Sequence, residues 1–110
     1  MTPKKAFIPS TIMELREKLS AMFLSAPTFI DKTGHLPFLN LDYVFMQLTQ
    51  GLTLNRSNLG DGNYAKLMDM TNAMRPLFEA DPEDKTGEAV KGQAIINDML
   101  ELLEKLGKRT

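Results

Sequence analysis

The residues that most resemble a chemical motif form the stretch LGDGNYAKL, where Gly60, Gly62 and Ala65 fit the dinucleotide-binding pattern G-x-G-x-x-G/A. That pattern binds a pyrophosphate only where a buried β-strand leads into the glycine turn and a helix follows. The preceding residues, LTLNRSN, form no apolar β run. We therefore expect a turn between two helices, with Asp61 or Asn63 capping the second one. On this interpretation Gly62→Val should damage folding, and nucleotides should not stabilise the protein.

A second phosphate-binding pattern is incomplete. Gly87 and Gly92 have the glycine spacing of a P-loop. Gln93 and Ala94, however, stand where that loop needs a lysine for the phosphates and a hydroxyl residue for Mg²⁺. The segment therefore lacks the groups that would neutralise a bound nucleotide.

Residues for acid–base, nucleophilic or metal chemistry are also scarce. The chain has no cysteine and a single histidine, His35, so a zinc site or a serine triad lacks its usual partners. Carboxylates pair at helical spacing at Glu14 and Glu17 and at Glu101 and Glu104, but lysine or arginine flanks each pair, as on a solvated helix face. We expect no catalytic residue, no metal site and no cofactor.

Composition limits the class of protein further. The chain has 110 residues, 43% of them hydrophobic and 25% charged, which suits one domain over residues 1–110. A net charge of −1 gives no general attraction to nucleic acid or to an anionic membrane. No apolar run reaches the length of a membrane span or of a signal-peptide core, so we expect a cytoplasmic location.

Apolar residues recur at helical spacing in four segments, which predict helices over residues 11–25, 40–54, 63–79 and 87–106. The expected fold is all-α, a small four-helix bundle-like domain. Residues 27–39 lack this periodicity and contain a central turn, which indicates an ordered extended loop or a short hairpin.

Residues that begin or bend helices support these boundaries. Thr11 and Glu14 fit a capping box, while Asn40 and Thr86 are suited to cap the second and last helices. Pro76 lies almost opposite the apolar face of the third helix. It should bend that helix convex to water rather than end it.

Some side chains, apolar except for Gln50, fall outside the main stripes and could form a partner-binding surface. The candidates are Met13, Leu24, Tyr43, Met46, Gln50, Ile96 and Leu100. The alternative for the second helix is that it is central and buried on both sides. Methionine is common at adaptable binding surfaces, although most of the eight methionines are expected to fill the core.

The linker before the last helix is acidic and offers a second surface. Its acidic patch consists of Glu79, Asp81, Glu83 and Asp84. Such a patch could bind a basic partner, but a run of like charges is more often a solvated linker.

Two hypotheses follow for function. The first is a non-enzymatic protein–protein interaction module, regulatory, adaptor or immunity-type, that binds another protein or forms a homodimer. The alternative is a helical DNA-binding regulator that uses the second and third helices. Its recognition helix would carry Lys66 and Arg75 but also Asp69, and these cations do not gather on one face, so nucleic acid is not the expected partner.

Overall fold

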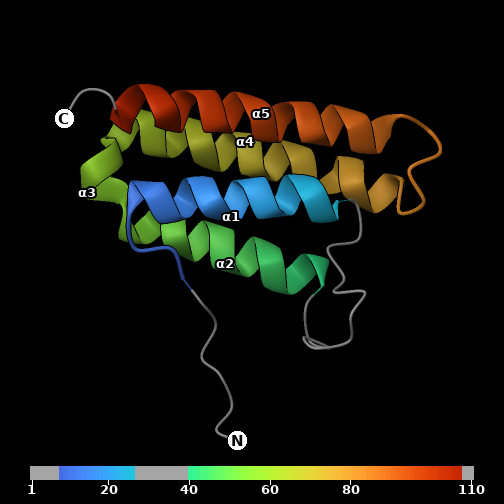
Figure 1. Ribbon diagram of the computed structural model, residues 1–110, viewed down its shortest axis with the longest axis horizontal. Helices are drawn as coiled ribbons and strands as arrows, with labels where there is room; N and C mark the ends of the chain where they lie inside the picture. The colour runs from blue at the N-terminus through green and yellow to red at the C-terminus, as the bar shows by residue number, and fades with distance from the viewer. Residues whose placement is uncertain (1–7, 27–39, 108–110) are drawn as a thin grey trace, which may run out of the picture.

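The computed structural model describes residues 8–26 and 40–107 (Figure 1). Five helices occupy them: α1 (Ile12–Ser25), α2 (Leu41–Leu54), α3 (Arg56–Leu59), α4 (Asp61–Ala80) and α5 (Glu88–Gly107). No strand occurs in these two ranges, so the predicted all-α class is confirmed for the described chain. The predicted loop or hairpin at 27–39, with His35, lies outside the described residues.

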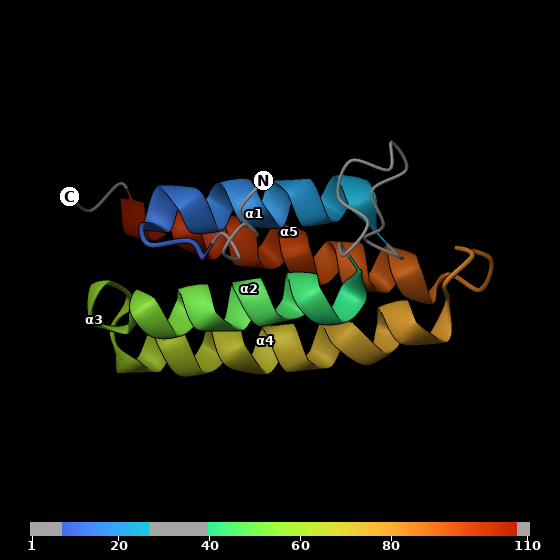
Figure 2. The same ribbon diagram turned by 90° about the horizontal axis from the view of Figure 1, so that it is seen from below.

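The four long helices run in alternating directions (Figure 1). Helices α1 and α4 point one way, while α2 and α5 point the other. Seen from below, α1 lies beside α5 and α2 lies beside α4, so that the helices form two layers (Figure 2). Contacts also join the layers, because α1 packs against α2 and α4 packs against α5.

One hydrophobic core lies between these helices. Each long helix contributes a stripe of buried side chains: Leu15, Leu19 and Met22 from α1; Val44, Phe45, Leu48 and Leu52 from α2; Leu67, Met74 and Phe78 from α4; Ala89, Ile96, Met99 and Leu103 from α5. Leu59 of α3 completes the core. Most members of a stripe are three, four or seven residues apart, which is the spacing that turns one helix face inward.

Side-chain caps start the first two long helices as predicted. The Thr11 hydroxyl accepts a hydrogen bond from the Glu14 N–H at 3.1 Å, and the Asn40 side chain accepts one from the Tyr43 N–H at 2.9 Å. The Glu14 carboxylate accepts bonds from the backbone N–H and the hydroxyl of Ser10, at 2.7 and 2.9 Å. The bonds from the Glu14 and Tyr43 N–H groups satisfy donors at helix starts that have no partner within the helix.

The connection between α2 and α4 contains a short helix where the sequence analysis predicted only a turn. Residues Arg56–Leu59 form the short helix α3, and Gly60 then turns the chain with φ of +86°. Neither Asp61 nor Asn63 caps α4, because Gly60 is the N-cap residue and no side-chain cap bond forms. The Asp61 carboxylate instead accepts a bond from Arg56 Nε at 2.9 Å. The predicted side-chain cap is therefore wrong. The chain enters α4 through the positive φ angle of Gly60 instead.

Gly62 also differs from its predicted role. It lies within α4, and a Cβ added there would meet no atom within 4 Å. These open surroundings do not support the expectation that Gly62→Val damages folding. The conformationally demanding glycine of the stretch is Gly60, since positive φ is costly for residues with a side chain.

Pro76 lies inside α4 and is exposed to solvent, on the side predicted from the sequence. Figure 2 shows the C-terminal part of α4 curving toward α5. In the part of the chain that the structure describes, no helix is long and apolar enough to cross a membrane.

Candidate protein-interaction groove

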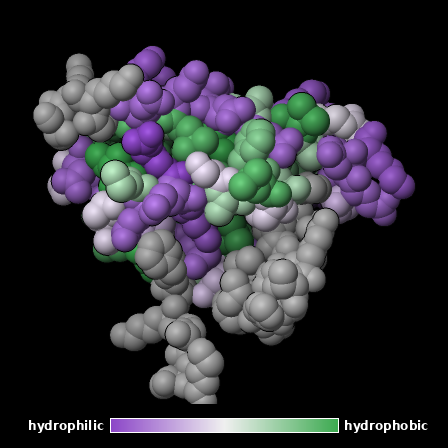
Figure 3. All heavy atoms as spheres, viewed as in Figure 1, coloured by the Kyte–Doolittle hydropathy of each residue, from purple (hydrophilic) through white to green (hydrophobic). Residues whose placement is uncertain are grey.

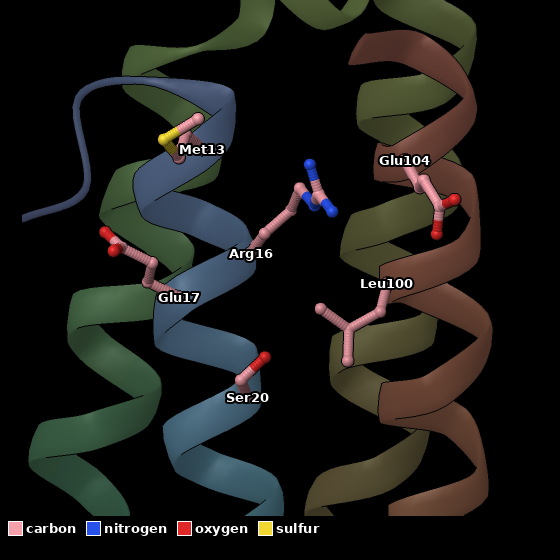
Figure 4. A pocket seen from close by; sticks show the side chains of 6 residues that line it. All are labelled: Met13, Arg16, Glu17, Ser20, Leu100 and Glu104. Atoms are coloured by element: carbon pink, nitrogen blue, oxygen red, sulfur yellow. The ribbon is translucent and has the colours of Figure 1, made fainter. Parts of the chain in front are cut away.

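An open groove of about 430 Å³ lies between α1 and α5 (Figure 4). Its lining residues are Met13, Arg16, Glu17 and Ser20 from α1 and Leu100 and Glu104 from α5. The two helices run antiparallel, so the start of α1 faces the end of α5. This arrangement brings together two of the predicted surface residues, Met13 and Leu100, which are distant in sequence.

The side chains of the groove combine apolar and charged groups. Figure 4 shows Arg16 reaching from α1 toward α5, Leu100 directed from α5 toward α1, and Glu17 directed away from α5. Within the described residues neither Arg16 nor Glu17 forms an ion pair. The groove is suited to recognising a surface with an apolar centre and charges of both signs.

The outward side of α1 continues this surface beyond the groove. Met13, Glu17, Ser20 and Leu24 repeat at helical spacing and are all exposed, and we call them the α1 ridge. Met13 is 66% exposed and Leu24 is 83% exposed, the two highest values among the large apolar side chains of the described residues. Figure 3 shows hydrophobic residues interspersed with hydrophilic ones on the face that α1 and α5 present.

One residue that was predicted to lie on the surface is buried in the core. Ile96 has no exposed area and belongs to the core, so it cannot contribute to a binding surface in this conformation. The sequence placed it at the edge of a wide apolar arc on the last helix. Because α5 packs against both α1 and α4, that arc is covered on two sides, and Leu100, which lines the groove, is half-buried.

The three candidates on α2 lie apart from the groove. Tyr43 and Met46 are half-buried and Gln50 is exposed, so this face of α2 is neither a second core nor a fully open surface. Gln50 lines a smaller hollow of about 300 Å³ together with Ile8, Thr53 and Leu54. Leu54 is 60% exposed, and the sequence analysis did not single it out.

The predicted acidic patch is not a set of four free carboxylates. The Glu79 carboxylate lies 3.5 Å from Nε of Arg75, and the Glu83 carboxylate lies 2.8 Å from Nζ of Lys85. Asp81 is only 2% exposed and is directed into the protein, so its assignment to an acidic surface was wrong. Asp84 is exposed and has φ of +56°.

Asp81 instead holds the start of α5. One carboxylate oxygen accepts bonds from the N–H groups of Lys85 at 2.7 Å and Thr86 at 3.1 Å, and the other accepts from Ala89 at 3.1 Å. Burial alone would raise the pKa of Asp81, but the bonds from Ala89, Lys85 and Thr86 outweigh it and hold the pKa below its ordinary value. The predicted cap, Thr86, accepts only a long bond of 3.4 Å from the Glu88 N–H.

The sequence analysis missed a half-buried lysine, Lys18, and a fully buried asparagine, Asn55. Lys18 of α1 donates to the side-chain carbonyl of Gln47 on α2, and burial lowers the pKa of Lys18 to about 8. Asn55 is fully buried and donates to the carbonyls of Pro9 at 3.2 Å and Gly51 at 2.8 Å. Helical spacing could have placed Lys18 beside the core stripe of α1, but it could not identify Gln47 as its acceptor.

Metal-ligating side chains do not gather in the part of the chain that the structure describes. That part contains no group of three or more histidine, cysteine, aspartate or glutamate side chains that could hold a metal ion. The glycines at 60 and 62 are preceded by helix α3 rather than by a strand, so the dinucleotide-binding pattern lacks its structural setting.

The comparisons with known proteins add no further information. No family model, no curated protein and no solved structure matches this chain.

Proposed function

We propose that this protein is a non-enzymatic interaction module, of a regulatory, adaptor or immunity type, that binds a protein through the α1 ridge and the adjoining groove. The four long helices serve as a bundle-like scaffold that holds this surface. The observation that carries the proposal is the exposure of Met13 and Leu24 on one line of α1, beside a groove that contains Leu100. Large apolar side chains exposed among polar ones occur at protein-binding surfaces.

The alternative, a DNA-binding regulator, receives less support from the same structure. A helix-turn-helix motif presents its second helix at a steep angle to the first, whereas α2 and α4 lie side by side (Figure 2). Arg75 of α4 is already paired with Asp42 of α2 and with Glu79. The α2–α4 surface therefore lacks the concentration of free cations that phosphate contacts need.

Affinity capture from the native host, combined with surface variants, tests the proposal. The bait is the full chain, used as wild type and as Leu24→Glu, which places a charge at the most exposed position of the α1 ridge. We expect a protein that wild type captures to be lost or strongly reduced with Leu24→Glu. A charge in the centre of an apolar contact leaves a desolvated, unpaired group.

Leu54→Glu is the matched control, because Leu54 is also an exposed leucine but lies on α2, away from the groove. Capture should survive this change. If Leu54→Glu abolishes capture while Leu24→Glu does not, the binding surface is on α2 instead. Binding to duplex DNA that weakens steeply with salt would favour the alternative function.

A further inference from the structure

We propose that Lys18 is a modification site, at which the side-chain amine takes an acyl group from a small activated acyl donor such as a thioester. Lys18 lies on the side of α1 that contacts α2, where its amine donates to the side-chain carbonyl of Gln47. The groove lies on the α5 side of α1, so this inference is independent of the proposed interaction function.

The surroundings of Lys18 give its ammonium form little support. The side chain is half-buried where α1 packs against α2, so water solvates its charge incompletely. Its acceptor, Gln47, is only 5% exposed and is a neutral amide, which stabilises a cation less than a carboxylate does. The remaining exposed part of the side chain leaves the amine open to a small reagent.

The carboxylates of α1 and α2 do not neutralise this amine. Glu14 lies four residues before Lys18, a spacing that favours an ion pair, but its carboxylate accepts two bonds from Ser10. The only carboxylate of α2 belongs to Asp42, which pairs with an arginine of α4. Glu17 is adjacent in sequence, and neither it nor Lys18 forms an ion pair with a described residue. Lys18 is therefore a half-buried cation without a counter-ion among the described residues.

This setting favours the neutral amine, which is the nucleophilic form of lysine. Burial lowers the pKa of Lys18 to about 8, so about 10% of its amine is neutral at pH 7, against about 0.03% for an amine with the ordinary value of 10.5. The other lysines of the described residues lie where the ammonium is paired or solvated. Lys85 and Lys91 each contact a carboxylate, and Lys66 and Lys105 are exposed to water.

The acylation step needs no group beyond the donor. The lone pair of Nζ attacks the carbonyl carbon of the thioester, an N–C bond forms and the C–S bond breaks. The departing thiolate takes up the proton that the nitrogen loses, so nothing is oxidised or reduced. The product is a neutral amide whose remaining N–H is still a donor for Gln47. Modification therefore removes the poorly solvated charge without removing the donor between α1 and α2.

Competitive acetylation of the full chain tests the proposal. The probe is a small thioester, S-acetyl-N-acetylcysteamine, in limiting amount at pH 7, and mass spectrometry of peptides gives the rate at each lysine. We expect Lys18 to react at least about fivefold faster than the exposed Lys66, because its larger neutral fraction exceeds the losses from lower basicity and partial burial. In urea this advantage should vanish. A rate at Lys18 no higher than at Lys66 overturns the proposal, as does an advantage that persists in urea.

Gln47→Glu separates the effect of charge from that of access. The change keeps the size of the side chain and gives the Lys18 ammonium a carboxylate partner. Acetylation at Lys18 should slow at least about fivefold, while the rate at Lys66 stays the same. An unchanged rate at Lys18 in a variant that keeps its helical circular dichroism overturns the proposal.

The pH profile of wild type gives a test that does not depend on the folding of a variant. The rate of acetylation at Lys18 should rise with pH and level off above about pH 8, where most of its amine is already neutral. A rate at Lys18 that keeps rising steeply to about pH 10 would mean that the amine is solvated like an ordinary lysine, and the proposal would fail.

Discussion

Phe78 of α4 occupies the space that a side chain at Gly92 of α5 would need. A Cβ built on Gly92 would lie 2.6 Å from Cζ of the Phe78 ring, closer than real contacts of this kind. Phe78 is almost fully buried, so its ring has little room to move aside. The close approach of α4 and α5 at this level therefore depends on the absence of a side chain at position 92.

Gly92→Ala should consequently destabilise the protein. The overlap with Phe78 is expected to cost about 1–3 kcal/mol, which exceeds the helix-propensity gain of about 0.5–1 kcal/mol. Urea denaturation gives the free energy of unfolding. Gly62→Ala is the matched control, because a Cβ at Gly62 meets nothing within 4 Å, and it should stabilise α4 slightly. Equal effects at both positions would show that the Phe78 contact is unimportant.

Gly60→Ala tests the turn between α3 and α4. Gly60 has φ of +86° and ψ of 149°, a region that residues with a Cβ rarely adopt. We expect a loss of about 1–3 kcal/mol in the free energy of unfolding, although no neighbouring atom would be touched. A Gly60→Ala variant as stable as wild type would mean that this turn adopts another conformation in solution.

Asp81 should make the protein sensitive to acid. Its pKa in the folded state lies below the ordinary value, so the unfolded chain binds the proton first as the pH falls. The stabilisation is therefore complete above the ordinary aspartate pKa and is lost as the pH falls through the lower, folded value. Thermal melts should show that Asp81→Ala lowers Tm clearly at neutral pH and that this difference from wild type shrinks in acid. Glu83→Ala, an exposed change in the same loop, is the control and should change Tm little.

Lys18 should make the stability of the protein depend on pH in the alkaline range. Burial lowers its pKa from 10.5 to about 8, so between these values the unfolded chain holds a proton that the folded chain has released. Stability should rise with pH across this window, and the cost of the buried charge is present in full below it. Lys18→Met removes that cost together with the bond to Gln47, so its stability relative to wild type should be highest at neutral pH and should decline toward about pH 10.5. Lys66→Met, a lysine-to-methionine change at an exposed position, is the control and should change Tm little in the same melts.

The helices were predictable because periodicity and caps act locally. The predicted segments agree with α1, α2, α4 and α5 to within two residues at each end. Thr11 and Asn40 could be identified as caps because each bonds an N–H three residues along the chain. Core residues such as Leu19 and Leu48 followed from the same spacing.

Features that depend on which helices are neighbours were not predictable in this way. Ile96 was assigned to a surface because one helix considered alone does not show how many partners cover it. Asp81 was assigned to an acidic patch because its bond to Ala89 spans eight residues of irregular chain. The groove itself needed the antiparallel pairing of α1 with α5 to bring Met13 and Leu100 together.

The bonds of Asp81 also bear on the order in which the protein folds. They fix the chain between α4 and α5 from residue 81 to residue 89, so the two helices are joined by a short, internally bonded connection. Closing such a connection costs little chain entropy, whereas pairing α1 with α5 requires most of the sequence to be brought together. We expect the α4–α5 hairpin to form early and α1 to dock last. Asp81→Ala should then slow refolding, while Leu19→Ala should mainly speed unfolding in stopped-flow experiments.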